Sequence, residues 1–287
     1  MVQKTVQKIV ESKWQSEGRG AKVRRSIGRP ELRNLDPFLM LDEFSGNAKN
    51  GAGFPDHPHR GFETVSYLLE GEFTHEDFCG HKGILRPGDL QWMTAGRGVV
   101  HSEMPGKVDT RGLQLWVNLK KEFKMVPPDY QELQAKDIPT GETNGVKVKV
   151  IAGESMNIKS PVRTRTPTYY LDFEMKPGSS FVQNVPEGWT TFVYTLEGQI
   201  KFGSTKINPH HTVVFTKEGQ EIQFENDGNE SARFVLIGGQ PINEPIVQHG
   251  PFVMNTREEI NQAIMDYQLG QNGFENAHKW ESIEGNK

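Results

Sequence analysis

Three histidines and a glutamate are spaced in this sequence as two pairs of potential metal ligands. His57 and His59 form a His-x-His pair within residues 54–62 (FPDHPHRGF), and His101 and Glu103 form a His-x-Glu pair about 40 residues downstream. Because strand side chains alternate between two faces, each pair would point to one side of its strand. Two such strands facing each other would bring three imidazoles and one carboxylate together. The spacing indicates a metal site with positions open for water, oxygen or substrate.

A His-x-His pair alone also occurs on strands where both histidines are solvated or buried in a core. The second pair, flanked by Gly96, Gly98 and Pro105, favours the metal interpretation. The ligand types do not separate iron from manganese, nickel, copper or zinc. They also suit either a catalyst or a sensor whose metal changes its oxidation state.

The composition indicates an all-β chain whose net charge does not favour binding to nucleic acid. Its 287 residues include 30 Gly and 17 Pro, which predicts many short elements joined by turns. The net charge of −4 gives no global attraction to nucleic acid. The single cysteine, Cys79, excludes an intrachain disulfide, so we expect a reducing intracellular compartment. No apolar run reaches membrane-spanning length and the N-terminal residues lack a signal-peptide core, so we expect no membrane association.

An internal repeat predicts two β-domains in tandem. Residues 64–71 (TVSYLLEG) recur as residues 191–198 (TFVYTLEG), and residues 86–93 (RPGDLQWM) correspond loosely to 208–215 (NPHHTVVF). Proline and glycine break the pattern between residues 125 and 145. We therefore predict an N-terminal metal-binding domain over residues 1–134 and a C-terminal metal-free domain over residues 143–287.

The repeat also predicts that only the first domain binds metal. The offset of 127 residues (191 − 64) places three positions of the first copy on residues of other types: His57 on Asn184, His59 on Pro186 and Glu63 on Thr190. The neighbouring His210 and His211 do not restore a site, because adjacent strand residues point to opposite faces. We expect one metal per chain.

Residues 255–269 (NTREEINQAIMDYQL) are the clearest helix in the sequence. Thr256 and Glu259 form a capping box, and Gly270 is a plausible end. One apolar stripe consists of Ile260, Ala263, Ile264 and Tyr267. We expect this helix to dock on the outside of a sheet.

Four polar residues follow the first repeat and could suggest a second site. His75, Asp77, Cys79 and His81 lack the order of a metal site, which favours a loop over the barrel mouth. The basic stretch 22–29 (KVRRSIGR) favours a half-exposed strand or a protein contact over a DNA contact.

Several segments together resemble one protein family. Gly51, His57, His59, Glu63 and Gly71 follow the first motif of cupins. More specific likeness lies in residues 25–32 (RSIGRPEL), 54–69, 89–98 (DLQWMTAGRG), 112–118 (GLQLWVN) and 248–256 (QHGPFVMNT), which resemble the pirin family of the cupin superfamily. The resemblance covers nearly the whole chain. It implies a bicupin fold, with two tandem antiparallel β-barrels of the jelly-roll type and a C-terminal helix.

The resemblance also implies a ligand set. It gives iron, as Fe(II) or Fe(III), held by His57, His59, His101 and Glu103. Four protein ligands leave two open positions in an octahedron. Glu103 is then the candidate general base. The general cupin pattern places Glu63 at the metal instead, so Glu63 stays an alternative for the ligand and for the base.

Two functions are implied by the same resemblance. One is redox-dependent coregulation of transcription through nuclear factor κB and an ankyrin-repeat coactivator, by a monomer found in nucleus and cytoplasm. The other is quercetin 2,3-dioxygenase activity, with a flavonol and O₂ as substrates. The alternatives are a protein that is primarily a flavonol-cleaving dioxygenase and a bicupin whose metal is purely structural.

Overall fold

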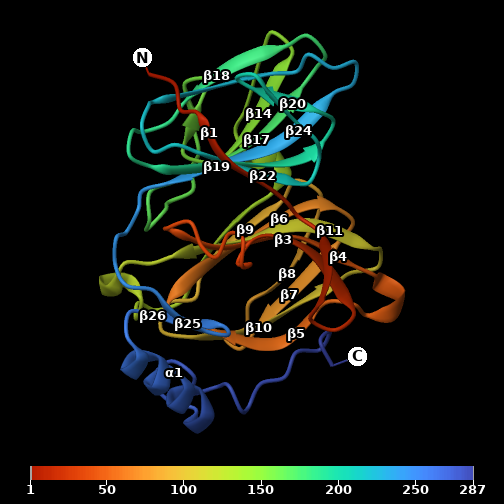
Figure 1. Ribbon diagram of the computed structural model, residues 1–287. Helices are drawn as coiled ribbons and strands as arrows, with labels where there is room; N and C mark the ends of the chain where they lie inside the picture. Colours follow the sequence, from red (N-terminus) through yellow and green to blue (C-terminus); the bar gives the residue numbers. More distant parts are fainter. Residues whose placement is uncertain (1, 287) are drawn as a thin grey trace. The chain divides into compact units, whose positions relative to one another are not determined.

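The computed structural model describes residues 2–286, which form two compact units of β-structure. Unit 1 consists of the residues up to Lys13, Ser26–Pro37 and Lys136–Pro241, and unit 2 of Trp14–Arg25, Phe38–Ala135 and the residues from Ile242 onward. Each unit contains a seven-stranded sheet and a four-stranded sheet, and most of their strands are labelled in Figure 1. The strand pairs that carry the site and the two cores are antiparallel.

Unit 2 carries the two predicted ligand pairs on its smaller sheet. The four-stranded sheet has the order β5-β10-β7-β8: β5 (Phe54–His59), β10 (Val99–Pro105), β7 (Phe73–Asp77) and β8 (Lys82–Leu85). The seven-stranded sheet has the order β12 (Asp129–Leu133), β9 (Leu90–Thr94), β6 (Phe62–Glu70), β11 (Thr110–Asn118), β4 (Phe38–Gly46), β3 (Ala21–Ile27) and β2 (Trp14–Glu17). Short 3₁₀ helices cover Ala48–Asn50, Lys121–Phe123 and Ala135–Asp137.

Unit 1 repeats this arrangement. Its four-stranded sheet has the order β18 (Ser180–Asn184), β23 (Glu221–Glu225), β20 (Ile200–Phe202) and β21 (Thr205–Ile207). Its seven-stranded sheet has the order β1 (Val6–Glu11), β22 (His211–Phe215), β19 (Thr190–Glu197), β24 (Ala232–Gly239), β17 (Thr168–Met175), β14 (Val146–Ala152) and β13 (Thr140–Thr143). A small hairpin is formed by β15 (Glu154–Ser155) and β16 (Ile158–Lys159).

The topology confirms the internal repeat. In both four-stranded sheets the strand that comes first in the chain lies beside the one that comes last, and the second and third follow. This order is β5-β10-β7-β8 in unit 2 and β18-β23-β20-β21 in unit 1. The repeated segments 64–71 and 191–198 fall on the equivalent strands β6 and β19. The predicted all-β fold of two double-sheet domains is therefore confirmed.

The two chain ends depart from the predicted ranges 1–134 and 143–287. At the N-terminal end, β1 pairs with β22 and belongs to unit 1. After Pro241 the chain joins unit 2 through β25 (Val247–His249) and β26 (Phe252–Met254). Phe252 and Met254 are buried there beside Met93 and Val99, and this burial of apolar surface explains the placement.

The C-terminal helix forms as the sequence predicts, but within unit 2. It is α1 (Arg257–Leu269), with Thr256 as the N-cap of a capping box with Glu259 and Gly270 in the left-handed conformation at its end. Ile260 and Ala263 are buried in the same apolar cluster as β26. The predicted range 143–287 had grouped this helix with the second β-domain. No helix among residues 2–286 is both long and apolar enough for a membrane span.

Candidate metal centre

The structure brings His57, His59 and His101 together between the sheets of unit 2. In the register of β5 and β10, His57 lies opposite His101. Nε2 of His57 lies 3.0 Å from Nε2 of His101, and one nitrogen from each of the three rings lies within 4.8 Å of the others. Among residues 2–286 this is the single group of three His, Cys, Asp or Glu side chains close enough to share a metal ion.

Two of the three imidazoles are prepared to act as neutral ligands. Burial, and after it the electrostatic interaction with His57, holds the pKa of His59 and of His101 well below the usual value of 6.5. The ring Nδ1 of His57 donates to the carbonyl of Pro55 over 2.7 Å, because a carbonyl can only accept, and this leaves Nε2 free to bind a metal. Within the described residues, both ring nitrogens of His59 are buried without a hydrogen-bond partner. A buried nitrogen of this kind fits a metal ligand.

A glycine turn places the strand that carries the histidine pair. Gly61 has φ +91°, and a Cβ there would lie 2.0 Å from the carbonyl oxygen of Val253. Only glycine fits both this conformation and this close approach. The chain therefore turns from β5 directly into β6 just after His59.

Aromatic rings form a wall beside the histidines. The ring centroid of His59 lies 5.2 Å from that of Phe62 and 5.2 Å from that of Trp116. The two aromatic rings are themselves 4.5 Å apart. Of the aromatic residues in this region, Trp92 faces elsewhere, because its Nε1 donates to Glu63. The wall shields one side of the site from water.

Glu103 lies beside the three nitrogens but outside their group. Its Oε2 is 4.0 Å from Nε2 of His101, and the residue is 2% exposed. Ser66 donates its hydroxyl to Oε1 over 2.8 Å, and Gln114 donates its amide to Oε2 over 2.8 Å. These two bonds fix the carboxylate next to His101. Its roles as the fourth ligand and as the base stay predictions.

Glu63 is held on the other face of the seven-stranded sheet. It accepts from Nε1 of Trp92 over 3.0 Å and from the hydroxyl of Thr94 over 2.7 Å. Ser66, three residues further along β6, points toward Glu103. Residues an odd number of positions apart on a strand face opposite sides, so the Glu63 carboxylate points away from the histidines.

The second polar cluster divides between a strand and a turn. His75 and Asp77 lie on β7, opposite Glu103 and His101 of β10, and are not part of the loop that the sequence suggested. Asp77 accepts from the backbone of Cys79, and burial with the nearby Asp77 charge raises the pKa of the Cys79 thiol to about 11. His75 and Asp77 therefore border the site, while Cys79 stays protonated at neutral pH.

Sequence reasoning missed the two residues that hold Glu103. Ser66 and Gln114 lie on β6 and β11, and they reach Glu103 from the opposite sheet. No short motif marks them, because an isolated serine or glutamine on a strand is common. Only the pairing of the two sheets shows their role.

Unit 1 contains no comparable set at the equivalent positions. Asn184 is exposed at the end of β18, and Pro186 and Thr190 follow it in the chain. The buried Gln183 of β18 is instead bonded to Ser155 of the β15–β16 hairpin, over 2.6 Å. His211 begins β22, where its Nδ1 donates to the carbonyl of Pro209.

Comparisons with known proteins agree with this architecture. Residues 20–117 match the model of the pirin family, and residues 170–273 match that of the pirin C-terminal cupin domain. The chain is 58% identical to human pirin over 99% of both proteins, and 60% identical to a tomato pirin-like protein over 96% of both. A solved structure described as quercetin 2,3-dioxygenase from Acinetobacter baumannii superposes with a TM-score of 0.87 at 36% identity, covering 94% of this chain and 98% of that one. The chain therefore belongs to the pirin family, with two cupin domains.

Proposed function

We propose that this chain is an iron-dependent dioxygenase that cleaves flavonols of the quercetin type. The observation that carries the proposal is the convergence of three imidazoles, with one nitrogen from each within 4.8 Å of the others. The carboxylate of Glu103 lies 4.0 Å from one of them. The 36% identity to a protein described as a quercetin 2,3-dioxygenase supports the choice of substrate class.

The donor set fits a first-row transition metal. His57, His59 and His101 would hold the ion, with Glu103 as the fourth ligand, and two octahedral positions would remain open. Bound iron would supply a Lewis acid and an electron-transfer partner for oxygen. Three imidazoles and a carboxylate also accept manganese, nickel, copper or zinc, so the choice of iron rests on the family resemblance.

The protein's own contribution is to receive a proton and exclude water. A flavonol carries a 3-hydroxyl next to its carbonyl, and Glu103 is the carboxylate placed to accept the proton of that hydroxyl. Ser66 and Gln114 keep this carboxylate oriented. Phe62, which is fully buried, and Trp116, whose ring is tilted by 37° to it, give the site an apolar side that excludes water.

Turnover of two matched substrates tests the proposal. Iron-loaded protein in air should consume quercetin, with loss of its visible absorbance and release of carbon monoxide. Luteolin, which is quercetin without the 3-hydroxyl, should not react. His101→Ala should abolish turnover, and His211→Ala in unit 1 should preserve it. Absence of quercetin turnover by ferrous protein with confirmed bound iron would refute the activity.

A second role in transcription is proposed from the family resemblance. It is redox-dependent coregulation by a monomer in nucleus and cytoplasm, through nuclear factor κB and an ankyrin-repeat coactivator. The full-length likeness to human pirin, 58% identity over 99% of both chains, supports it. Ferrous, ferric and apo protein should then differ in their effect on a κB-site DNA complex. Equal behaviour of the three forms would contradict this role, and a site that binds iron without either activity would point to a structural metal.

A further inference from the structure

The two residues that flank the His57–His59 pair are both held by the C-terminal end of the chain. Asp56 precedes His57 and Arg60 follows His59. Both make side-chain bonds to the stretch 251–286, which we call the C-terminal strap and which includes β26 and α1 (blue in Figure 1). The strap and the metal-bearing sheet are parts of the same unit.

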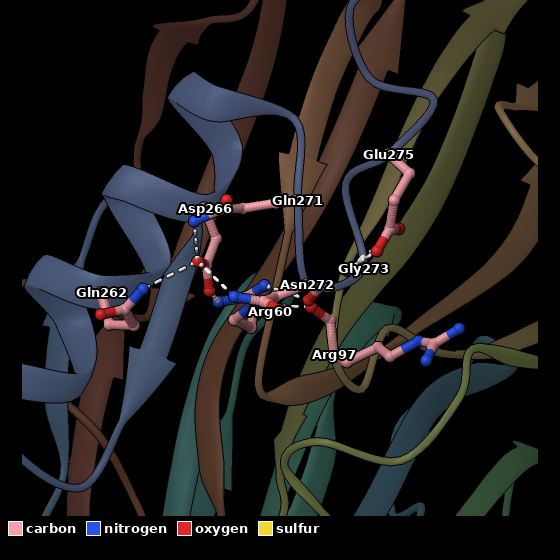
Figure 2. A network of polar contacts seen from close by, with 8 residues as sticks. All are labelled: Arg60, Arg97, Gln262, Asp266, Gln271, Asn272, Gly273 and Glu275. Atoms are coloured by element: carbon pink, nitrogen blue, oxygen red, sulfur yellow. Dashed lines mark hydrogen bonds and ion pairs between the residues drawn. The ribbon is translucent and has the colours of Figure 1, made fainter.

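Arg60 is anchored at three points. The residue is 1% exposed. Its Nη1 donates to Oδ2 of Asp266 over 2.7 Å and its Nη2 donates to the carbonyl of Asn272 over 2.7 Å, while Nε donates to the carbonyl of Arg97 over 2.6 Å. The guanidinium also lies 4.7 Å from the ring centroid of Phe274. Figure 2 shows these bonds converging on Arg60 from the end of α1 and the turn after it.

Asp266 is the centre of the strap's side of this network. It lies on the buried face of α1 and is 1% exposed. Its second oxygen, Oδ1, accepts from Gln262 over 2.8 Å, from Asn272 over 2.8 Å and from Gln271 over 3.3 Å (Figure 2). The carboxylate therefore joins α1 to its following turn through Oδ1, and ties both to the arginine next to His59 through Oδ2. Losing the charge of Asp266 would leave the Arg60 cation buried without its partner.

The end of the strap lies against the outer side of the metal-bearing strands. Oδ2 of Asp56 accepts from the backbone N–H of Ser282 over 3.1 Å. The backbone N–H of Ile283 donates to Glu76 of β7 over 3.0 Å. A Cβ on Gly285 would lie 3.1 Å from Oδ1 of Asp56. These contacts reach β5 at the residue that precedes His57.

The strap also pairs with the backbone after the histidines. The N–H of Arg60 donates to the carbonyl of Pro251 over 3.2 Å, and the N–H of Val253 donates to the carbonyl of Arg60 over 3.0 Å. Both the main chain and the side chain of Arg60 are therefore fixed by the strap. The ring nitrogens of His59, one residue before, have no hydrogen bond of good geometry within the described residues, so the position of the ring depends on the β5–β10 pairing and on these neighbours.

We propose that the C-terminal strap is a positioning element of the metal centre, in which Asp266 acts through Arg60 and the Ser282–Gly285 region acts through Asp56. A metal site requires its ligands within about 0.5 Å of the productive geometry. The strap holds both ends of the His57–His59 segment and so sets the affinity for the metal and the rate of its release. The inference rests on the metal centre of the proposed function, but not on the identity of the metal or the substrate.

The coupling is reciprocal by thermodynamic necessity. If a docked strap raises the metal affinity by some factor, bound metal stabilises the docked strap by the same factor. Loading the site should therefore slow hydrogen exchange of the amides of Ser282 and Ile283, which donate to Asp56 and Glu76. A segment that merely covers the sheet would exchange at the same rate with and without metal.

A pair of matched buried aspartates provides the test. Asp266→Asn removes the carboxylate charge beside Arg60, and Asp172→Asn removes the one beside Arg233 in unit 1, where Arg233 bonds Asp172 over 2.8 and 3.1 Å. The affinity for Co(II) is measured by competition with a chelating dye, and the visible Co(II) bands report ligand geometry. We expect Asp266→Asn to weaken Co(II) binding by about 10–100-fold, the usual cost of losing a group that orients ligands. Asp172→Asn should weaken it less than ~2-fold, although both variants lower the melting temperature.

Two further variants keep the test decisive if Asp266→Asn folds poorly. Asp266→Glu retains a carboxylate and should recover part of the Co(II) affinity. Gly285→Val should displace the strap end, because a Cβ there would lie 2.4 Å from Oγ of Ser282 and 3.1 Å from Oδ1 of Asp56, and should lower the affinity by several-fold. Gly228→Val in unit 1, where a Cβ would meet Asn226 at 3.3 Å, should not lower it.

Three outcomes would separate the hypotheses. Wild-type Co(II) affinity in both Asp266→Asn and Gly285→Val would overturn the positioning role. So would equal losses in the Asp266 and Asp172 variants, because these would show a general effect of stability. A wild-type protein that binds no Co(II) would instead refute the metal centre on which the proposed function depends.

Discussion

The two units have the same strand order but fill the space between their sheets differently. In unit 1 that space is packed with phenylalanine rings whose centroids lie 4.9–6.2 Å apart: Phe173, Phe181, Phe202, Phe224 and Phe234. Unit 2 also has an apolar cluster that includes the stacked rings of Phe44 and Phe73, but its neighbouring strands β5 and β10 add His57, His59, His101 and Glu103. The comparison shows that the fold needs no polar interior for its stability. The polar interior of unit 2 is therefore a feature of function.

Hydrogen bonding shows what the polar interior lacks. Buried polar groups cost free energy unless they are bonded. Glu103 has two donors and His57 has one acceptor, but neither nitrogen of His59 has a partner within residues 2–286. In unit 1 the buried Gln183 is bonded to Ser155, whereas in unit 2 a bound metal would satisfy the ring of His59.

Removing one histidine should produce the largest change. His101→Ala takes away one of three converging nitrogens, so we expect metal content to fall from one ion per chain to less than about a tenth. The measurement is elemental analysis of purified protein after dialysis. His211→Ala, the matched change in unit 1, should retain one ion. Two metals per wild-type chain would contradict the assignment of a single site.

The packed interior of unit 1 should respond in stability and not in metal content. Phe224 is fully buried among the other rings. Phe224→Ala should lower the free energy of unfolding by about 3–5 kcal/mol, because it leaves a cavity. Urea denaturation of the apo protein would measure this loss. If Phe224→Ala weakened metal binding more than Asp172→Asn does, the interior of unit 1 would also serve the site.

The two glutamates should differ by a smaller factor. Glu103 lies 4.0 Å from His101, whereas Glu63 is bonded to Trp92 and Thr94 on the opposite sheet face. We expect Glu103→Gln to weaken metal binding by about 10–100-fold and Glu63→Gln by less than ~3-fold. Dye competition with the same metal would compare them. Full occupancy in Glu103→Gln with loss in Glu63→Gln would reverse the assignment.

These comparisons also show which parts of the molecule can be predicted from its sequence. The histidine pairs were predictable, because strand periodicity and ligand chemistry are local properties of residues 57–59 and 101–103. The helix was predictable from its cap at Thr256 and its end at Gly270. The positions of Glu63 and Glu103 relative to the histidines were not, since they depend on which face of its sheet each residue occupies.

Long-range partners lay beyond the sequence altogether. Arg60 and Asp266 are 206 residues apart, and no local pattern marks either as half of a buried ion pair. No local pattern marks the partners of β1 and β26 either. Both look like ordinary short strands, and burial of apolar surface determines where they pack. The repeat correctly predicted two β-domains, but it could not show where the terminal segments pack.

The smallest expected effect is a pH dependence confined to the polar interior. The pKa values of His59 and His101 are lowered below 6.5 by burial in the folded apo protein. As pH falls through 6.5, the unfolded chain therefore binds more protons than the folded protein, so stability decreases toward acid and levels off above 6.5. Each histidine contributes at most about 1.4 kcal/mol per pH unit, so the pair should account for roughly 1 kcal/mol between pH 7 and pH 6.

Variants of the two units isolate this contribution. Urea denaturation of the apo protein at pH 7 and pH 6 gives the loss of stability for each variant. The double variant His59→Gln/His101→Gln should show a loss about 1 kcal/mol smaller than that of the wild type. His211→Gln should keep the wild-type loss, because His211 begins a strand of unit 1 and is not fully buried. An unchanged loss in the double variant would mean that protons enter the folded site freely, and the interior of unit 2 would then be wetter than its burial indicates.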